Sequence, residues 1–282
     1  MDVKNKIILW MIPLIKVLKS TQSHPFHLVD PSPWPLFTSL SAFGCASGAV
    51  LYMHAYSGAT FTLISSFLLL ILSKTGWWRD VVREASFEGH HTSNVQIGLR
   101  YGMLLFIISE VLFFFAFLWA FFHSSLSPAI EIGSIWPPKG IDVLDPWKIP
   151  FLNTLILLLS GCTITWAHHS IIANLRMQTI LGLGCTLILA VVFTSFQVLE
   201  YTIASFRLAD GIYGSTFYII TGFHGFHVFI GTTILLICLV RMAKYQLTYQ
   251  HHFGFEAAAW YWHFVDVIWL VLFVSIYWWG GL

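Results

Sequence analysis

Residues 102–122 read GMLLFIISEVLFFFAFLWAFF and contain one charged residue, Glu110. An apolar run of this length can cross the hydrocarbon core of a bilayer as a helix. A carboxyl group at that depth costs roughly 3 kcal/mol even on insertion scales, so an intramembrane acid is a functional-site hypothesis by default. On a helix its face would be shared with Phe106, Phe113 and Phe114, which bring no counter-charge. We therefore expect an apolar site that favours the protonated acid.

The composition indicates an integral membrane protein. Hydrophobic residues make up 57% of the 282 residues and charged residues 10%, and the apolar residues occur in long blocks joined by short polar connections. The formal net charge of +1, without a dense cluster of basic residues, gives no reason to expect a nucleic-acid partner. Cys45, Cys162, Cys185 and Cys238 lie singly in separate blocks, which predicts core residues and not metal ligands.

A membrane-spanning helix needs about 20 mostly apolar residues. Seven segments are predicted to span: 34–53, 58–78, 102–122, 151–167, 179–199, 214–240 and 257–278. The connection 123–150 is rich in proline and is expected to be an ordered, turn-rich loop.

The basic residues predict the orientation of these spans. Eleven of the 14 Lys and Arg residues lie on the N-terminal side of the membrane, and Lys139, Lys148 and Arg207 lie on the other side. Basic residues concentrate in connections on the inner side. We therefore expect the N-terminus inside and, with an odd number of spans, the C-terminus outside.

Residues 1–23 precede the first span. They combine Lys4 and Lys6 with a short apolar stretch that Pro13 interrupts, and no small-residue cleavage site follows. This pattern favours a retained basic segment on the inner membrane surface over a signal peptide.

Thirteen histidines raise the question of metal or haem ligation. His224 and His227 share a helical face at a spacing of three residues, as do His263 and Asp266. Hydrogen bonds to neighbouring helices explain intramembrane His and Asp residues more simply. We interpret His263 and Asp266 as a structural intramembrane pair.

Glu110 lacks such a partner on its own helix. It is therefore the better candidate for proton exchange or for contact with another subunit. A hydrogen bond from Glu110 to a neighbouring helix is an alternative that the residues leave open.

The second span ends in the segment 77–84, WWRDVVRE, on the expected inner side. Tryptophans favour the headgroup level of a membrane, and basic clusters bind lipid phosphate. Arg79 and Arg83 are spaced by four residues, so both can face the same lipid. The alternative is an ordinary anchored helix end in which Asp80 pairs with Arg83.

Short motifs recur in one order along the chain. They are PSPWPL (31–36), WWRD (77–80), GHHT (89–92), GLRYGM (98–103), ISEVLFF (108–114), TWAHH (165–169), GFHGFH (222–227) and YWHFVD (261–266). In this order they resemble subunit III of cytochrome c oxidase, the aa3-type haem-copper terminal oxidase, and above all its mitochondrial forms. The resemblance runs from about His24 to the C-terminus, and the family usually lacks the segment before His24.

The resemblance implies an all-α integral membrane protein in which residues 1–282 form a single polytopic membrane domain. Seven transmembrane helices would form a two-helix bundle (helices I–II, residues 34–78) and a five-helix bundle (helices III–VII, residues 93–282) around a lipid-filled, V-shaped cleft. Residues 1–23 would be an N-terminal extension on the inner, matrix side.

The resemblance also implies a non-catalytic core subunit of respiratory complex IV, a proton-translocating oxidoreductase, in the mitochondrial inner membrane. It would stabilise the catalytic subunit, its proton entry and its oxygen and lipid path. The C-terminus of this chain would lie in the intermembrane space. Haem a, haem a3 and copper would belong to partner subunits I and II, and this chain would hold no redox centre and no metal. Further partners would be accessory subunits, bound phospholipids and members of respiratory supercomplexes.

The site residues implied by the resemblance include no catalytic residue. Glu110 occupies the position of an acid that hydrophobic carbodiimides modify in the family. The positions that match the lipid cleft are Trp78, Arg83, Glu84, His91 and Arg241. His24 and His27, just before the first span, are candidates for a proton relay to a neighbouring channel mouth.

Two other classes of function compete with this interpretation. A proton-coupled transporter would use Glu110 as its carrier and would transport in liposomes without partners. A self-contained haem or metal redox protein would retain bound metal after removal of its partners. The length of the collinear resemblance favours the oxidase subunit over both.

Overall fold

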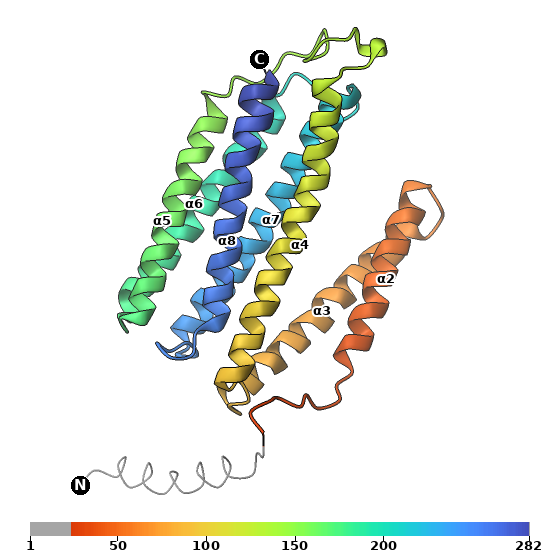
Figure 1. The fold of residues 1–282 in the computed structure, drawn as a ribbon. Coiled ribbons are helices and arrows are strands. Elements are labelled where there is room, and N and C mark those ends of the chain that lie inside the picture. Colours follow the sequence, from red (N-terminus) through yellow and green to blue (C-terminus); the bar gives the residue numbers. More distant parts are fainter. Residues whose placement is uncertain (1–23, 282) are drawn as a thin grey trace, which may run out of the picture. The chain divides into compact units, whose positions relative to one another are not determined.

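A computed structural model describes residues 24–281, so the predicted extension 1–23 lies outside the described residues. Within the described part, seven helices are long and apolar enough to cross a membrane, which confirms the predicted number. They are α2 (Trp34–Met53), α3 (Ala59–Ser86), α4 (Ser93–Leu126), α5 (Ile149–Ile172), α6 (Arg176–Ile203), α7 (Gly211–Ala243) and α8 (Phe253–Leu272) (Figure 1). A π-helical segment, η2 (Phe273–Trp278), and a 3₁₀ turn, η3 (Trp279–Gly281), continue α8.

Six of the helices extend beyond the predicted spans. Apolar runs mark the part of a helix in hydrocarbon, whereas the backbone hydrogen bonds continue into the headgroup region. The WWRDVVRE segment is therefore helical, as the last turns of α3. The predicted loop 123–150 contains one short 3₁₀ turn, η1 (Ile130–Ile132), and its first residues belong to α4.

The chain divides into two compact units, and their described parts are residues 24–99 and 100–281. In the first unit α2 packs along α3. A Cβ atom on Gly48 would come within 2.9 Å of the backbone of Leu63, so the glycine permits close approach of the two helices. Near the other end of α2, the Thr38 hydroxyl donates a hydrogen bond of 3.2 Å to Ser73 on α3.

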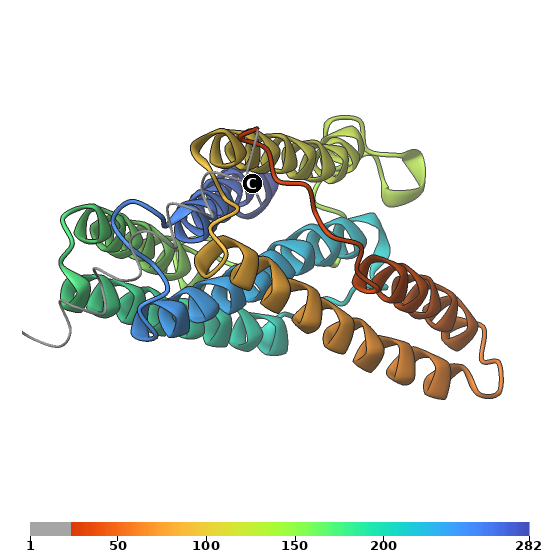
Figure 2. The same cartoon turned by 90° about the horizontal axis from the view of Figure 1, so that it is seen from below.

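The second unit contains a closed arrangement of four helices. α5 packs on α6, α6 on α7, α7 on α8 and α8 on α5 (Figures 1 and 2). Two fully buried indoles on α8 tie it to α5, because Trp262 donates to the Ser160 hydroxyl and Trp269 to the Thr154 hydroxyl, each at 2.9 Å. Buried indole N–H groups need such partners.

The part of α4 in this second unit, from Arg100 onward, contacts α7 and α8 through large side chains. The ring of Phe113 lies 5.0 Å from that of Phe223 on α7, and the ring of Phe114 lies 6.1 Å from that of Phe264 on α8. Phe113 and Phe114 follow Glu110 by three and four residues on α4, so these rings lie on the helical face of the acid.

Candidate functional site

Glu110 has a partner on α7. Its Oε2 atom lies 2.9 Å from Nε2 of His227. The Glu110 side chain is 22% exposed and that of His227 is 9% exposed. The structure therefore contains the hydrogen bond from Glu110 to a neighbouring helix, which was one of the alternatives that the sequence left open.

The second ring nitrogen of His227 decides how this pair can be protonated. Nδ1 lies 2.7 Å from the carbonyl oxygen of Phe223, and a carbonyl can accept but not donate, so Nδ1 carries a proton. Nε2 then either accepts a proton from the Glu110 acid or, in an imidazolium, donates to the carboxylate. In both forms the pair holds one proton between Oε2 and Nε2 and is neutral overall, which avoids a lone buried charge.

Aromatic rings from two helices surround the Glu110–His227 pair. The rings of Phe113 and Phe114 on α4 lie 6.1 and 4.9 Å from the His227 imidazole, and those of Tyr261 and Phe264 on α8 lie at 6.2 and 6.5 Å. The apolar lining expected from α4 is thus completed by α8. Periodicity within α4 could not identify the α8 contribution, since it comes from more than a hundred positions further along the chain.

His263 and Asp266 lie close together, as the spacing on one helix requires. Nδ1 of His263 is 3.8 Å from Oδ2 of Asp266, and Nε2 of His263 is 3.3 Å from the Thr165 hydroxyl on α5. Gly161 makes room for the acid, since a Cβ there would come within 2.9 Å of Asp266 Oδ2. The arrangement links α8 to α5.

A third buried acid, Glu200, was not predicted. It is 0% exposed on α6, and its Oε1 atom accepts hydrogen bonds from the Tyr277 hydroxyl at 2.6 Å and from Gln197 at 3.3 Å. Gln197 in turn accepts from Asn153 on α5 at 3.5 Å. The predicted span ended at residue 199 and therefore did not include this acid. The spacing of Gln197 and Glu200, three residues apart, was the available signal.

The two histidines of the GFHGFH motif have different partners although they share a helical face. Nε2 of His224 lies 3.2 Å from the carbonyl oxygen of Val265, whereas His227 faces Glu110. Within residues 24–281, no three His, Cys, Asp or Glu side chains lie close enough together to hold a metal ion.

Four of the five residues assigned to the lipid cleft lie in the first unit. Trp78 is 66% exposed, Arg83 is exposed, and Glu84 and His91 are half-buried. Arg241 belongs to the second unit, in the last turn of α7. Its buried Nε atom has no hydrogen-bond partner among the described residues.

The two candidate relay histidines differ in their contacts. Nε2 of His27 lies 3.7 Å from Oε2 of Glu84, and its ring stacks on that of His90 with centroids 4.8 Å apart. His24 accepts a local hydrogen bond of 3.3 Å from the backbone N–H of Phe26. The structure thus brings His27, but not His24, next to an acid of the lipid set.

The alternative pairing of Asp80 with Arg83 is wrong. Asp80 instead binds Arg79, at 2.9 Å, and accepts a hydrogen bond of 2.6 Å from the indole of Trp34 on α2. Arg79 can pair with its neighbour because both lie at the exposed edge of the helix, and the indole adds a second donor.

Comparison with known proteins gives a consistent result over most of the chain. A family model described as "Cytochrome c oxidase subunit III" matches residues 24–281. "Cytochrome c oxidase subunit 3" of Chondrus crispus is 69% identical over 271 residues, which cover 96% of this chain and 100% of the relative. Proteins of the same name from Prototheca wickerhamii and Arabidopsis thaliana are 63% and 61% identical, over 92% and 93% of this chain and 99% of each relative.

Proposed function

Because the chain belongs to the cytochrome c oxidase subunit III family, we propose that it acts in the mitochondrial inner membrane as the supporting subunit of the oxidase. In this role it packs against the catalytic subunit I and stabilises the proton entry and the oxygen path of that subunit. Haem a, haem a3 and copper are then held by subunits I and II, and accessory subunits and supercomplex members are further partners. The N-terminus lies in the matrix and the C-terminus in the intermembrane space.

The observation that carries this proposal is the collinear match of residues 24–281 to the family model. A local motif could be shared by chance, but a match over seven spans in one order places every helix in correspondence with the family. The distribution of basic residues supports the orientation, since Lys and Arg favour inner connections.

For Glu110 we propose the role of a proton-holding acid that hydrophobic carbodiimides modify. The shared proton with His227 supports this role, because these reagents react with protonated carboxyl groups in apolar surroundings. The aromatic lining from α4 and α8 supplies such surroundings. We expect labelling of Glu110 in the assembled oxidase and loss of the label in Glu110→Gln.

The set Trp78, Arg83, Glu84, His91 and Arg241 is proposed to contact phospholipid in a cleft. The exposed indole of Trp78 suits the headgroup level, and exposed Arg83 suits a phosphate. The buried Nε atom of Arg241 has no hydrogen-bond partner within residues 24–281, and such a cation also favours an anionic group.

His24 and His27 are proposed to relay protons on the matrix side. The contact of His27 with Glu84 and its stacking on His90 support a chain of titratable groups at this surface. Replacing both His24 and His27 with Gln should slow proton uptake by the oxidase. Unchanged uptake would exclude the relay.

The experiment that tests the whole assignment is purification of the affinity-tagged chain from mitochondrial membranes in mild detergent. A reduced-minus-oxidised visible spectrum of the recovered complex should contain the band of haem a. A spectrum without haem, from a preparation in which the chain is intact, would exclude the oxidase role and leave Glu110-dependent transport as the next hypothesis.

A further inference from the structure

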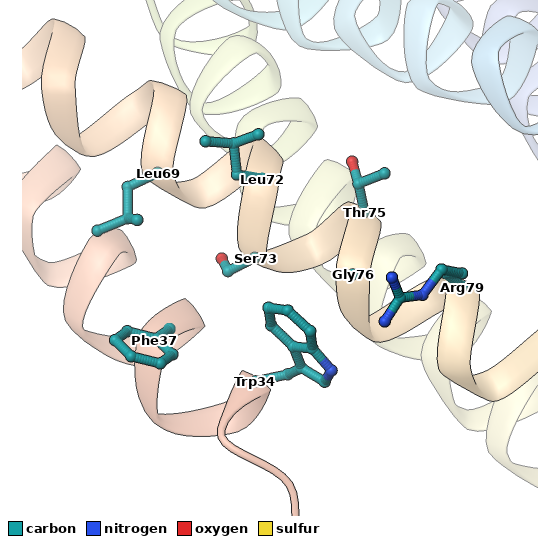
Figure 3. Close-up of a pocket in the computed structure, with 8 residues that line it drawn as sticks. All are labelled: Trp34, Phe37, Leu69, Leu72, Ser73, Thr75, Gly76 and Arg79. Atoms are coloured by element: carbon teal, nitrogen blue, oxygen red, sulfur yellow. The ribbon is translucent and has the colours of Figure 1, made fainter.

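A groove of about 470 Å³ lies between α2 and α3 within the first unit (Figure 3). This volume falls within the range of roughly 300–1,000 Å³ that small-molecule sites occupy. Residues of its lining include Trp34 and Phe37 from α2 and Leu69, Leu72, Gly76 and Arg79 from α3. None of the five residues of the proposed lipid cleft lines it.

The walls of the groove are apolar and open to the surroundings. Phe37, Leu69 and Leu72 are 45%, 44% and 67% exposed. The indole of Trp34 lies against the backbone of Gly76, where a Cβ atom would come within 2.6 to 2.9 Å of the ring. Because the indole N–H is bound to Asp80, the ring is held in this position and forms a fixed wall.

The hydroxyl groups along the groove are already used. Ser73 donates to the carbonyl oxygen of Leu70 and Thr75 to that of Ile71, so neither offers a free donor to a ligand. A polar molecule would therefore find few partners along the length of the groove. An alkyl chain requires none.

Arg79 places a cation at one end of the groove. Its Nε and Nη2 atoms each lie 2.9 Å from Oδ1 of Asp80. A guanidinium has five N–H groups, and within residues 24–281 the remaining ones have no hydrogen-bond partner. These groups can bind a phosphate, for which guanidinium has the matching geometry.

We propose that the groove binds a phospholipid, with one acyl chain along Leu69, Leu72 and Phe37 and the phosphate on Arg79. From Leu69 to Arg79 the helix rises about 15 Å, at about 1.5 Å per residue. This length is half of a hydrocarbon core of about 30 Å, so it matches one leaflet. Arg79 also follows the exposed Trp78, a residue type that marks the headgroup level. The charge of Arg79 and the length of the groove therefore both indicate a phospholipid.

The proposal can be tested in the intact oxidase with a diazirine analogue of leucine at position 72. After illumination, mass spectrometry of the peptide that contains position 72 should detect one added phospholipid. Arg79→Gln removes the charge-assisted hydrogen bonds, so the yield of this adduct should fall about tenfold. Arg79 is exposed, and equal recovery of haem a with wild type and variant will verify assembly.

Lys74→Gln is the matched control, because Lys74 is an exposed cation on the same helix that does not line the groove. It should leave the adduct unchanged. Arg83→Gln separates this site from the proposed cleft, since it should lower cleft lipid without changing the adduct at position 72. A crosslink from position 72 to a protein chain, or an equal lipid adduct in Arg79→Gln, would overturn the proposal.

Discussion

At the scale of single residues, the proton shared by Glu110 and His227 makes one substitution mild and another costly. The amide of Glu110→Gln can donate to Nε2 of His227 as the protonated acid does, so we expect a change in stability below about 1 kcal/mol. His227→Leu leaves a part-buried carboxyl group without its partner, which should cost about 1–3 kcal/mol. The measurement is the temperature at which the tagged chain dissociates from the oxidase at a fixed heating rate.

The comparison of the two variants tests the hydrogen bond between Glu110 and His227. In Glu110→Gln the imidazole is neutral, with its proton on Nδ1, and Nε2 accepts from the new amide. Equal losses in the two variants would contradict this account, because they would mean that the amide does not replace the hydrogen bond of Glu110.

Glu200 gives a second prediction at this scale. Tyr277 donates the shorter of the two hydrogen bonds to this fully buried acid. Tyr277→Phe removes the donor and should destabilise the chain by about 1–3 kcal/mol. Tyr249→Phe, at a position 52% exposed, is the matched control and should have no effect. The same dissociation assay applies, and equal midpoints for the two variants would refute the role of Tyr277.

The sequence could identify buried acids but not their partners. Glu110 and Asp266 were found because each interrupts an apolar run. His227 could not be paired with Glu110, because the contact depends on how α4 packs against α7, and helical periodicity carries no information on which helices meet. Glu200 was missed for a different reason, since the predicted apolar span ended at Leu199, one residue before it.

At the scale of helices, small residues determine how closely α5 and α6 approach. A Cβ on Gly182 would lie 2.9 Å from Cβ of Ala167 and 3.1 Å from the carbonyl oxygen of Thr163. Gly182→Ala should therefore force the helices apart and cost about 1–3 kcal/mol. Gly184, two residues further along α6, has no atoms within 4 Å of such a Cβ, so Gly184→Ala should be neutral or mildly stabilising.

The Gly182 prediction is measured as the yield and thermal midpoint of the assembled oxidase. Gly184→Ala controls for helix propensity, since both variants make the same chemical change on one helix. A loss that is equal in the two variants would contradict the packing explanation, because a Cβ at Gly184 meets no atoms within 4 Å.

The number of helices could be predicted from the sequence, whereas the ends of most helices could not. The span 34–53 matched α2 because Pro33 and a polar turn limit the helix on both sides. The last turns of α3 contain Arg79, Asp80 and Arg83. A search for apolar runs ends before these charged residues, although their backbone hydrogen bonds continue the helix. The polar end of α3 can therefore be recognised only from its tertiary contacts, such as the hydrogen bond from Trp34 to Asp80.

At the scale of the whole molecule, the residues of the proposed lipid cleft come from both units of the chain. Trp78, Arg83, Glu84 and His91 were grouped with Arg241 by family resemblance and not by any pattern in the sequence. The spacing of residues along the chain does not predict how the two units pack, because helical periodicity describes contacts within a helix and not contacts between units. The orientation of the chain, in contrast, is a prediction from the distribution of basic residues that can be tested directly.

The distribution of Lys and Arg predicts that the connection after α4 faces the intermembrane space and that the connection after α7 faces the matrix. To test this, the four cysteines are replaced with alanine. Lys139→Cys or Gln250→Cys, both at exposed positions, is then introduced. An impermeant maleimide should label Lys139→Cys in mitochondria whose outer membrane has been opened. Gln250→Cys should react after the inner membrane is permeabilised. The reverse pattern would invert the topology and move His24 and His27 away from the matrix, which would remove the basis for their proposed role in proton uptake.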